Sequence, residues 1–219
     1  MKNSHKRNIR KIKGDASFRK FYRKKENKFT SIIVKAHKEK EKNLLIYDSI
    51  NKILNKNKVF APKLYNEKYT YNFIEIEDFG DKTFYKLLKK KTNKLLYFKK
   101  IIKILNKIQS IKDRKIKNFK NKNYTIPKYD RKILIEEASL FSDWYIEKKL
   151  KKKDKIFFNK HFKKIIKKLS FNLQLRNDVF VHRDFHVSNL MLIKKGIGVI
   201  DSQDALIGNK AYDLSSLID

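Results

Sequence analysis

Short apolar and β-branched runs occupy the first third of the chain, and each has the length of a strand. Residues 9–12, 18–22 and 30–34 form three such runs. Residues 69–77 alternate between isoleucine and glutamate near their end, as expected for a strand with one face in solvent. Between the third and fourth runs, residues 38–54 carry the three- and four-residue spacing of a helix. The pattern predicts a β-rich segment with one helix.

Helical spacing dominates the middle of the chain. Apolar residues recur every three or four positions over residues 95–108 and 158–173, and residues 129–150 form a third candidate helix. We interpret these stripes as core-facing. A β-rich first third followed by a helical remainder predicts an α+β fold with two lobes, divided into residues 1–78 and 79–219.

Composition narrows the class of protein. Hydrophobic residues make up 41% of the 219, which argues against disorder. The chain contains no cysteine, which excludes disulfides and thiolate metal sites. No apolar run approaches the roughly 18 residues of a membrane span, and the basic N-terminus lacks the apolar core of a signal peptide. We therefore expect a cytoplasmic monomer that does not bind membranes.

The net charge of +33 suggests nucleic-acid binding, but the kind of basic residue argues against it. Lysines number 48 and arginines only 8, although arginine is the preferred reader of phosphates and bases. The lysines alternate with apolar positions along the helices, which is the pattern of a solvated face. We interpret the charge as compositional, with an attraction for anionic substrates as a secondary effect.

Candidate chemistry is concentrated in one late segment. His182-Arg183-Asp184 is followed by Asn189, and Asp201 ends a short apolar run. This is the order of groups used in phosphoryl transfer, where a carboxylate accepts the proton of the attacking hydroxyl while an amide oxygen and a second carboxylate hold Mg²⁺. Asp184 fits the first role, and Asn189 and Asp201 fit the metal roles. The alternative is an ordinary loop with an Asx turn and a helix cap.

Two earlier features are candidates for contact with phosphates. The small-residue turn at 14–18 contains Ser17, whose hydroxyl and neighbouring N–H groups could approach phosphate oxygens, although the turn also fits a plain hairpin. Lys35 ends the third strand, where a lysine pairs with the α- and β-phosphates in kinases. A solvent-facing lysine is the alternative in so lysine-rich a chain. Candidate acidic partners of Lys35 are Glu39, Glu41 and Asp48.

The tripeptide Asp78-Phe79-Gly80 spells the metal-binding motif of protein kinases, but it precedes the catalytic segment instead of following it. We interpret it as a hinge between the lobes, with backbone groups near the adenine. Asp204 could contact metal or substrate. Asp213 is expected to cap a helix or to bind the catalytic loop through hydrogen bonds.

These segments resemble the aminoglycoside phosphotransferase superfamily, and most of all its bacterial anomeric kinases of N-acetylmuramate and N-acetylglucosamine. The likeness rests on residues 15–19, 77–83, 140–145 and 181–213. It implies a protein-kinase-like fold and a transferase that uses ATP and Mg²⁺ to phosphorylate the anomeric hydroxyl of an N-acetylated amino sugar in cell-wall recycling. By this likeness Ser17 contacts the nucleotide, and Glu137 and Trp144 border the sugar pocket. We add Phe18, Lys35 and Glu77 to the expected nucleotide-binding residues and Asp204 to the expected substrate residues. Lys35 departs from the family, whose members often lack a lysine at that position.

The resemblance leaves three questions open. The acceptor could instead be an aminoglycoside, choline or homoserine. Relatives continue with further helices beyond the segment that matches residues 211–217, so we expect the C-terminal helical part to be truncated. A catalytically inactive, basic module that binds RNA or anionic surfaces is the alternative from another functional class.

Overall fold

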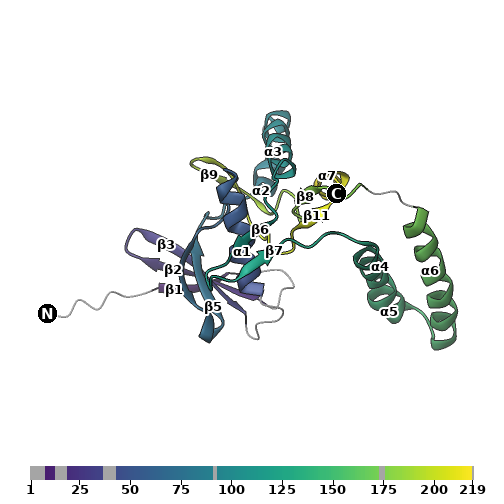
Figure 1. The fold of residues 1–219 in the computed structure, drawn as a ribbon. Coiled ribbons are helices and arrows are strands. Elements are labelled where there is room, and N and C mark those ends of the chain that lie inside the picture. The colour runs from purple at the N-terminus through teal and green to yellow at the C-terminus, as the bar shows by residue number, and fades with distance from the viewer. Residues whose placement is uncertain (1–7, 13–18, 37–42, 91–92, 173–175, 219) are drawn as a thin grey trace.

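The computed structural model describes residues 8–12, 19–36, 43–90, 93–172 and 176–218 (Figure 1). Ser17 and Phe18 lie outside these residues, as do Glu39 and Glu41. Within the described residues, no helix is both long and apolar enough to cross a membrane.

A five-stranded antiparallel sheet forms the N-terminal lobe, with strand order β1-β2-β3-β5-β4. Helix α1 packs on one face of this sheet, where Val34, Ala36 and Ile74 meet Leu44 and Tyr47 in a buried cluster. The elements of this lobe are β1 (Asn8–Ile12), β2 (Arg19–Glu26), β3 (Phe29–Ala36), α1 (Asn43–Lys56), β4 (Leu64–Lys68), the short 3₁₀ helix η1 (Tyr69–Tyr71) and β5 (Phe73–Glu77).

The sheet follows the predicted pattern with two differences, the first of which is the additional strand β4. Residues 69–77 do not form a single strand, because Asn72 adopts a left-handed conformation with φ of 57° and separates η1 from β5. Only the alternating part, Phe73–Glu77, pairs with β3. The alternation of isoleucine and glutamate was therefore the reliable signal.

The second lobe combines helices with short hairpins. Strands β9 and β10 pair with each other, as do β8 and β11. Buried side chains from α1, α3, these strands and the loop between β8 and β9 form one core, including Ile50, Ile101, Leu105, Phe185 and Leu190. The elements are α2 (Phe84–Lys89), α3 (Lys94–Gln109), β6 (Lys115–Lys117), β7 (Asn123–Thr125), α4 (Arg131–Leu140), the π-helix η2 (Phe141–Ile146), α5 (Glu147–Lys149), α6 (Lys152–Asn172), β8 (Val179–Val181), β9 (Leu190–Ile193), β10 (Gly196–Val199), β11 (Leu206–Gly208) and α7 (Ala211–Ile218).

Helices α4 to α6 form a hairpin that extends away from the rest of the lobe (Figure 1). It joins the lobe through α4, whose Ile133 and Leu134 pack against the β8–β11 pair. The helix predicted over residues 129–150 is interrupted by the wider turn of η2. The prediction that the α6 stripe faces a core was wrong for Ile165 and Leu169, which are both more than half exposed. The physical reason is the position of the hairpin, because no described element covers that face of α6.

Candidate active site

A cavity of about 700 Å³ lies between the sheet of the first lobe and the catalytic segment of the second. This volume falls within the usual range for small-molecule sites. Strands β2, β3 and β5 and helix α1 contribute one wall, and the loops around β9 and β10 contribute the other. The cavity brings together four of the residues predicted from the sequence: Glu77, Asp184, Asn189 and Asp201.

The loop that carries Asp184 is held from beneath by Asp213 at the start of α7. The Asp213 carboxylate accepts hydrogen bonds from the backbone N–H groups of His182 (2.8 Å) and Arg183 (2.9 Å). Arg183 has φ of 74°, a strained conformation for a residue with a side chain, and these bonds help to maintain it. The predicted hydrogen bonding of Asp213 to the catalytic loop is therefore confirmed. Burial raises the pKa of Asp213 to about 6.

The carboxyl group of Asp184 is partly buried on the cavity wall, where its charged form is disfavoured. Desolvation raises the pKa of its carboxyl group above the ordinary value, and the negative charges of Asp201 and Asp204 add to this shift. A raised pKa increases the affinity of a carboxylate for the proton it must accept. Asp184 can therefore take a proton from a hydroxyl group that enters the cavity.

The side chain of Asn189 is oriented by the contacts of its amide nitrogen. That nitrogen donates to the backbone carbonyl of Asp184 at 3.1 Å and lies 3.2 Å from Nε2 of His186. The amide oxygen is thereby the atom left to meet a cation. Asp201, with φ of 61°, supplies a partly exposed carboxylate on the same cavity.

This donor set fits Mg²⁺, which is commonly bound by one or two protein oxygens together with phosphates and water. Among the described residues there is no cluster of three or more histidine, cysteine, aspartate or glutamate side chains that could hold a metal alone. Asn189 and Asp201 are thus suited to a cation that arrives with a nucleotide.

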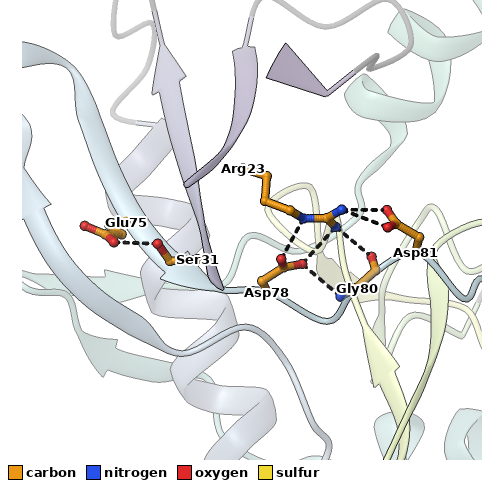
Figure 2. Close-up of polar contacts among 6 residues, drawn as sticks. All are labelled: Arg23, Ser31, Glu75, Asp78, Gly80 and Asp81. Carbon is orange, nitrogen blue, oxygen red and sulfur yellow. Dashed lines mark hydrogen bonds and ion pairs between the residues drawn. The ribbon is translucent and has the colours of Figure 1, made fainter. Parts of the chain in front are cut away.

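The connection after β5 is clamped by Arg23 of β2 (Figure 2). The Arg23 guanidinium pairs with Asp78 (2.6 Å) and with Asp81 (2.8 Å), and it donates to the carbonyl of Gly80. Asp78 also accepts the N–H of Gly80 at 2.8 Å, which closes a tight turn. With its side chain only 3% exposed and paired to Arg23, Asp78 is held as part of the turn between the lobes.

Lys35 lies away from the cavity. Its side chain is exposed, while its neighbours Val34 and Ala36 are buried against α1. Asp48, the described one of its three candidate partners, is buried and pairs instead with Lys52 at 2.8 Å. The structure therefore does not bring Lys35 to the candidate site.

The predicted substrate residues also lie outside the cavity lining. Glu137 of α4 accepts a hydrogen bond from the Tyr129 hydroxyl at 2.6 Å and pairs with Arg183. It thus joins the helical hairpin to the catalytic loop. Trp144 is 65% exposed on η2, and Asp204 accepts a hydrogen bond from the side chain of Gln203 at 2.5 Å.

Among the cavity residues that were not singled out from the sequence are Arg19, Arg23 and Tyr47. Burial, followed by the charge of Asp201, raises the pKa of Tyr47 to about 12. The rarity of arginine could have identified Arg19 and Arg23 as candidates. A chain that uses lysine on its solvated faces is expected to keep arginine for positions that require a planar cation with several donors.

Comparison with known proteins identifies the family. The model of the phosphotransferase enzyme family (APH) matches residues 8–219. N-acetylmuramate/N-acetylglucosamine kinase of Neisseria meningitidis is 25% identical over 204 residues, and the same-named enzyme of Pseudomonas putida is 26% identical over 203 residues. Each alignment covers 93% of this chain but only 59% and 57% of the two relatives, respectively.

A solved structure agrees with this assignment at the level of fold. The ADP-bound aminoglycoside phosphotransferase APH(2'')-Ib superposes with a TM-score of 0.61 at 16% sequence identity, covering 95% of this chain and 70% of that one. The two-lobed, kinase-like α+β fold expected from the sequence is confirmed. The chain belongs to the phosphotransferase enzyme family.

Proposed function

We propose that this protein is an ATP-dependent kinase that phosphorylates the anomeric hydroxyl of an N-acetylated amino sugar. The observation that carries the proposal is the convergence of Asp184, Asn189 and Asp201 on one cavity between two lobes. The lobe boundary at residue 78 belongs to the same proposal, because the sheet ends at Glu77 and the clamped turn follows it.

The chain's own groups define the mechanism. Asp184 orients the sugar hydroxyl and accepts its proton, while Asn189 and Asp201 would hold Mg²⁺. The bound cation would neutralise charge on the nucleotide phosphates. The Asp213 hydrogen bonds and the Arg183–Glu137 pair keep the loop in place, so that positioning supplies much of the rate.

The choice of acceptor is supported by the two curated relatives, whose names specify N-acetylmuramate and N-acetylglucosamine. Glu137, Trp144 and Asp204 remain the proposed acceptor-side residues. Of these, Asp204 lies near enough to Asp184 to influence its pKa. The proposal includes a role in the cytoplasmic recycling of cell-wall sugars, where free amino sugars of this kind are the substrates.

Phosphate transfer to matched sugars tests the proposal. The purified protein is incubated with MgATP and N-acetylmuramate or N-acetylglucosamine, and the products are analysed by ³¹P NMR. The matched control is the methyl glycoside of N-acetylglucosamine, in which the anomeric oxygen is blocked. A sugar 1-phosphate from the free sugars and no product from the glycoside is expected. Equal transfer to the glycoside, or transfer only to choline or an aminoglycoside, would refute the acceptor.

A further inference from the structure

A buried arginine, Arg19, lines the cavity beside Asp201. We infer that Arg19 of β2 binds the nucleotide phosphates in place of Lys35; the inference rests on the proposed function. The Arg19 side chain is only 7% exposed. It donates to Asp201 at 3.0 Å and to Gln203 at 2.5 Å.

The strand register determines which cation faces the cavity. Arg19 lies opposite Ala36 in the antiparallel β2–β3 pair, and Lys20 lies opposite Lys35. Residues directly opposite one another project from the same face of a sheet. Arg19 and Ala36 are both buried, whereas Lys20 and Lys35 are both exposed. The lysines therefore project from the other face, and the small Ala36 accompanies the large guanidinium on the cavity side.

Asp201 places Arg19 close to the expected phosphates. A Mg²⁺ ion held by Asp201 would have phosphate oxygens in its first shell. Adjacent ligands of one octahedral Mg²⁺ ion lie only about 3 Å apart, and opposite ligands about 4 Å apart. Since Arg19 Nη2 is 3.0 Å from Oδ1 of Asp201, phosphate oxygens on that ion come within reach of the guanidinium.

Arginine is well suited to this role. Its guanidinium stays charged at any working pH and presents a planar fork of N–H donors that matches phosphate oxygens. Gln203 accepts from Arg19 through Oε1 and donates to Asp204 through Nε2, so the position of the guanidinium is set by two further side chains. A fixed cation loses little freedom when a phosphate binds.

Measurements of nucleotide affinity distinguish two roles for Arg19: direct binding of the phosphates, or positioning of Asp201 alone. Calorimetry compares adenosine with ADP, each in Mg²⁺ and in EDTA, for the wild-type protein, Arg19→Met and the matched charge control Lys35→Met. For Arg19→Met we expect ADP affinity to fall by about 10- to 100-fold in both buffers, with adenosine affinity within about twofold of wild type. Lys35→Met should change neither affinity by more than about twofold.

Each other outcome overturns the inference. A loss for Arg19→Met that is confined to Mg²⁺ buffer would mean that Arg19 only positions Asp201. An equal loss in Lys35→Met would restore the lysine to the role. If Arg19→Met does not fold, as judged by its thermal transition, Arg19→Lys decides. A fall in ADP affinity in EDTA supports phosphate binding by the guanidinium fork, and unchanged ADP affinity in EDTA overturns the inference. If the wild-type protein binds neither adenosine nor ADP, the proposed function itself fails.

Discussion

Three carboxylates on the cavity differ in the groups that hold them. Asp78 is nearly inaccessible and pairs with Arg23, whereas Asp201 is partly exposed and pairs with Arg19. Asp184, whose pKa is raised, is the base in the proposed mechanism. A carboxylate already saturated by an arginine within a tight turn is a poor metal ligand. The contacts therefore favour Asp201 over Asp78 as the metal residue, as does its position in the sequence after the catalytic loop.

Removing each of these two aspartates should affect the metal dependence of nucleotide binding differently. For Asp201→Ala we expect the gain in ADP affinity on adding Mg²⁺ to fall by about tenfold or more, equivalent to about 1.4 kcal/mol per tenfold. For Asp78→Ala we expect that gain to persist, because Asp78 acts within the turn. Calorimetric titration with and without Mg²⁺ measures the ratio for each protein. A larger loss at Asp78 would reverse the metal assignment.

His182 gives the catalytic loop a predicted pH dependence of stability. Burial, followed by the charge of His186, lowers the pKa of His182 to about 4 in the folded protein. The unfolded state, with the ordinary pKa of about 6.5, binds the proton more readily. The stabilisation is therefore complete above pH 6.5 and is lost as the pH falls toward 4.

Chemical denaturation at pH 7 and pH 5 tests this dependence. Between these values the folded state should lose about 2 kcal/mol through His182. Asp213 acts in the opposite direction, because its raised pKa favours the folded state as the pH falls. The comparison protein is therefore His182→Leu, which keeps Asp213. Its stability should fall less than that of the wild type over this interval. Equal losses in both proteins would contradict the assignment.

At the scale of elements, the β9–β10 hairpin packs closely against the turn between the lobes. A Cβ atom added at Gly198 of β10 would lie 2.6 Å from two ring carbons of Phe79. Gly198 also forms a bridge with Phe60, which joins the hairpin to the segment that precedes β4. The absence of a side chain at Gly198 therefore lets the turn lie flat against the second lobe.

A Gly198→Ala substitution should displace Phe79 and destabilise the protein by about 1–3 kcal/mol. In a Phe79→Ala background the same substitution should cost much less, because the clash is absent. Thermal or urea unfolding of the four proteins of this cycle measures the coupling. Additive costs would show that the contact between the ring and residue 198 does not limit this packing.

The helical hairpin of α4 to α6 shows where element-level patterns fail. Its apolar stripe has helical spacing and the predicted helices form, yet Ile165 and Leu169 of that stripe are more than half exposed. Periodicity reports that a helix has an apolar face but does not report what covers that face. In α3, by contrast, Leu105 and Ile108 of the predicted stripe are buried, because this end of the helix packs against the main core. The prediction was wrong for Leu95 and Phe98 near the start of α3, which are both exposed.

At the scale of the whole molecule, the fold and the order of the catalytic groups could be predicted from the sequence. Asp184, Asn189 and Asp201 lie in one continuous segment, so their spacing was readable. Lys35 could not be placed in this way. The face of the sheet from which the Lys35 side chain projects depends on the strand register. The sequence does not specify that register, because it has lysines at both positions 20 and 35. The Arg19–Asp201 pair spans 182 residues and becomes visible only in the folded chain.

The cavity between the two lobes is the proposed site of phosphate transfer, and the reaction itself can be measured. If the cavity between them is a kinase site, Asp184→Asn should bind MgATP with nearly wild-type affinity. It should nevertheless transfer phosphate to N-acetylmuramate or N-acetylglucosamine about 10² to 10⁴ times more slowly, because the general base is gone.

The deciding measurement is the single-turnover rate of phosphate transfer by the wild-type protein and by Asp184→Asn at saturating MgATP, with binding confirmed by calorimetry on the same samples. We predict measurable transfer by the wild type, and for the variant a loss of rate within that range with ATP affinity within about threefold of wild type. Equal rates in the two proteins, with both fully loaded with nucleotide, would contradict the account.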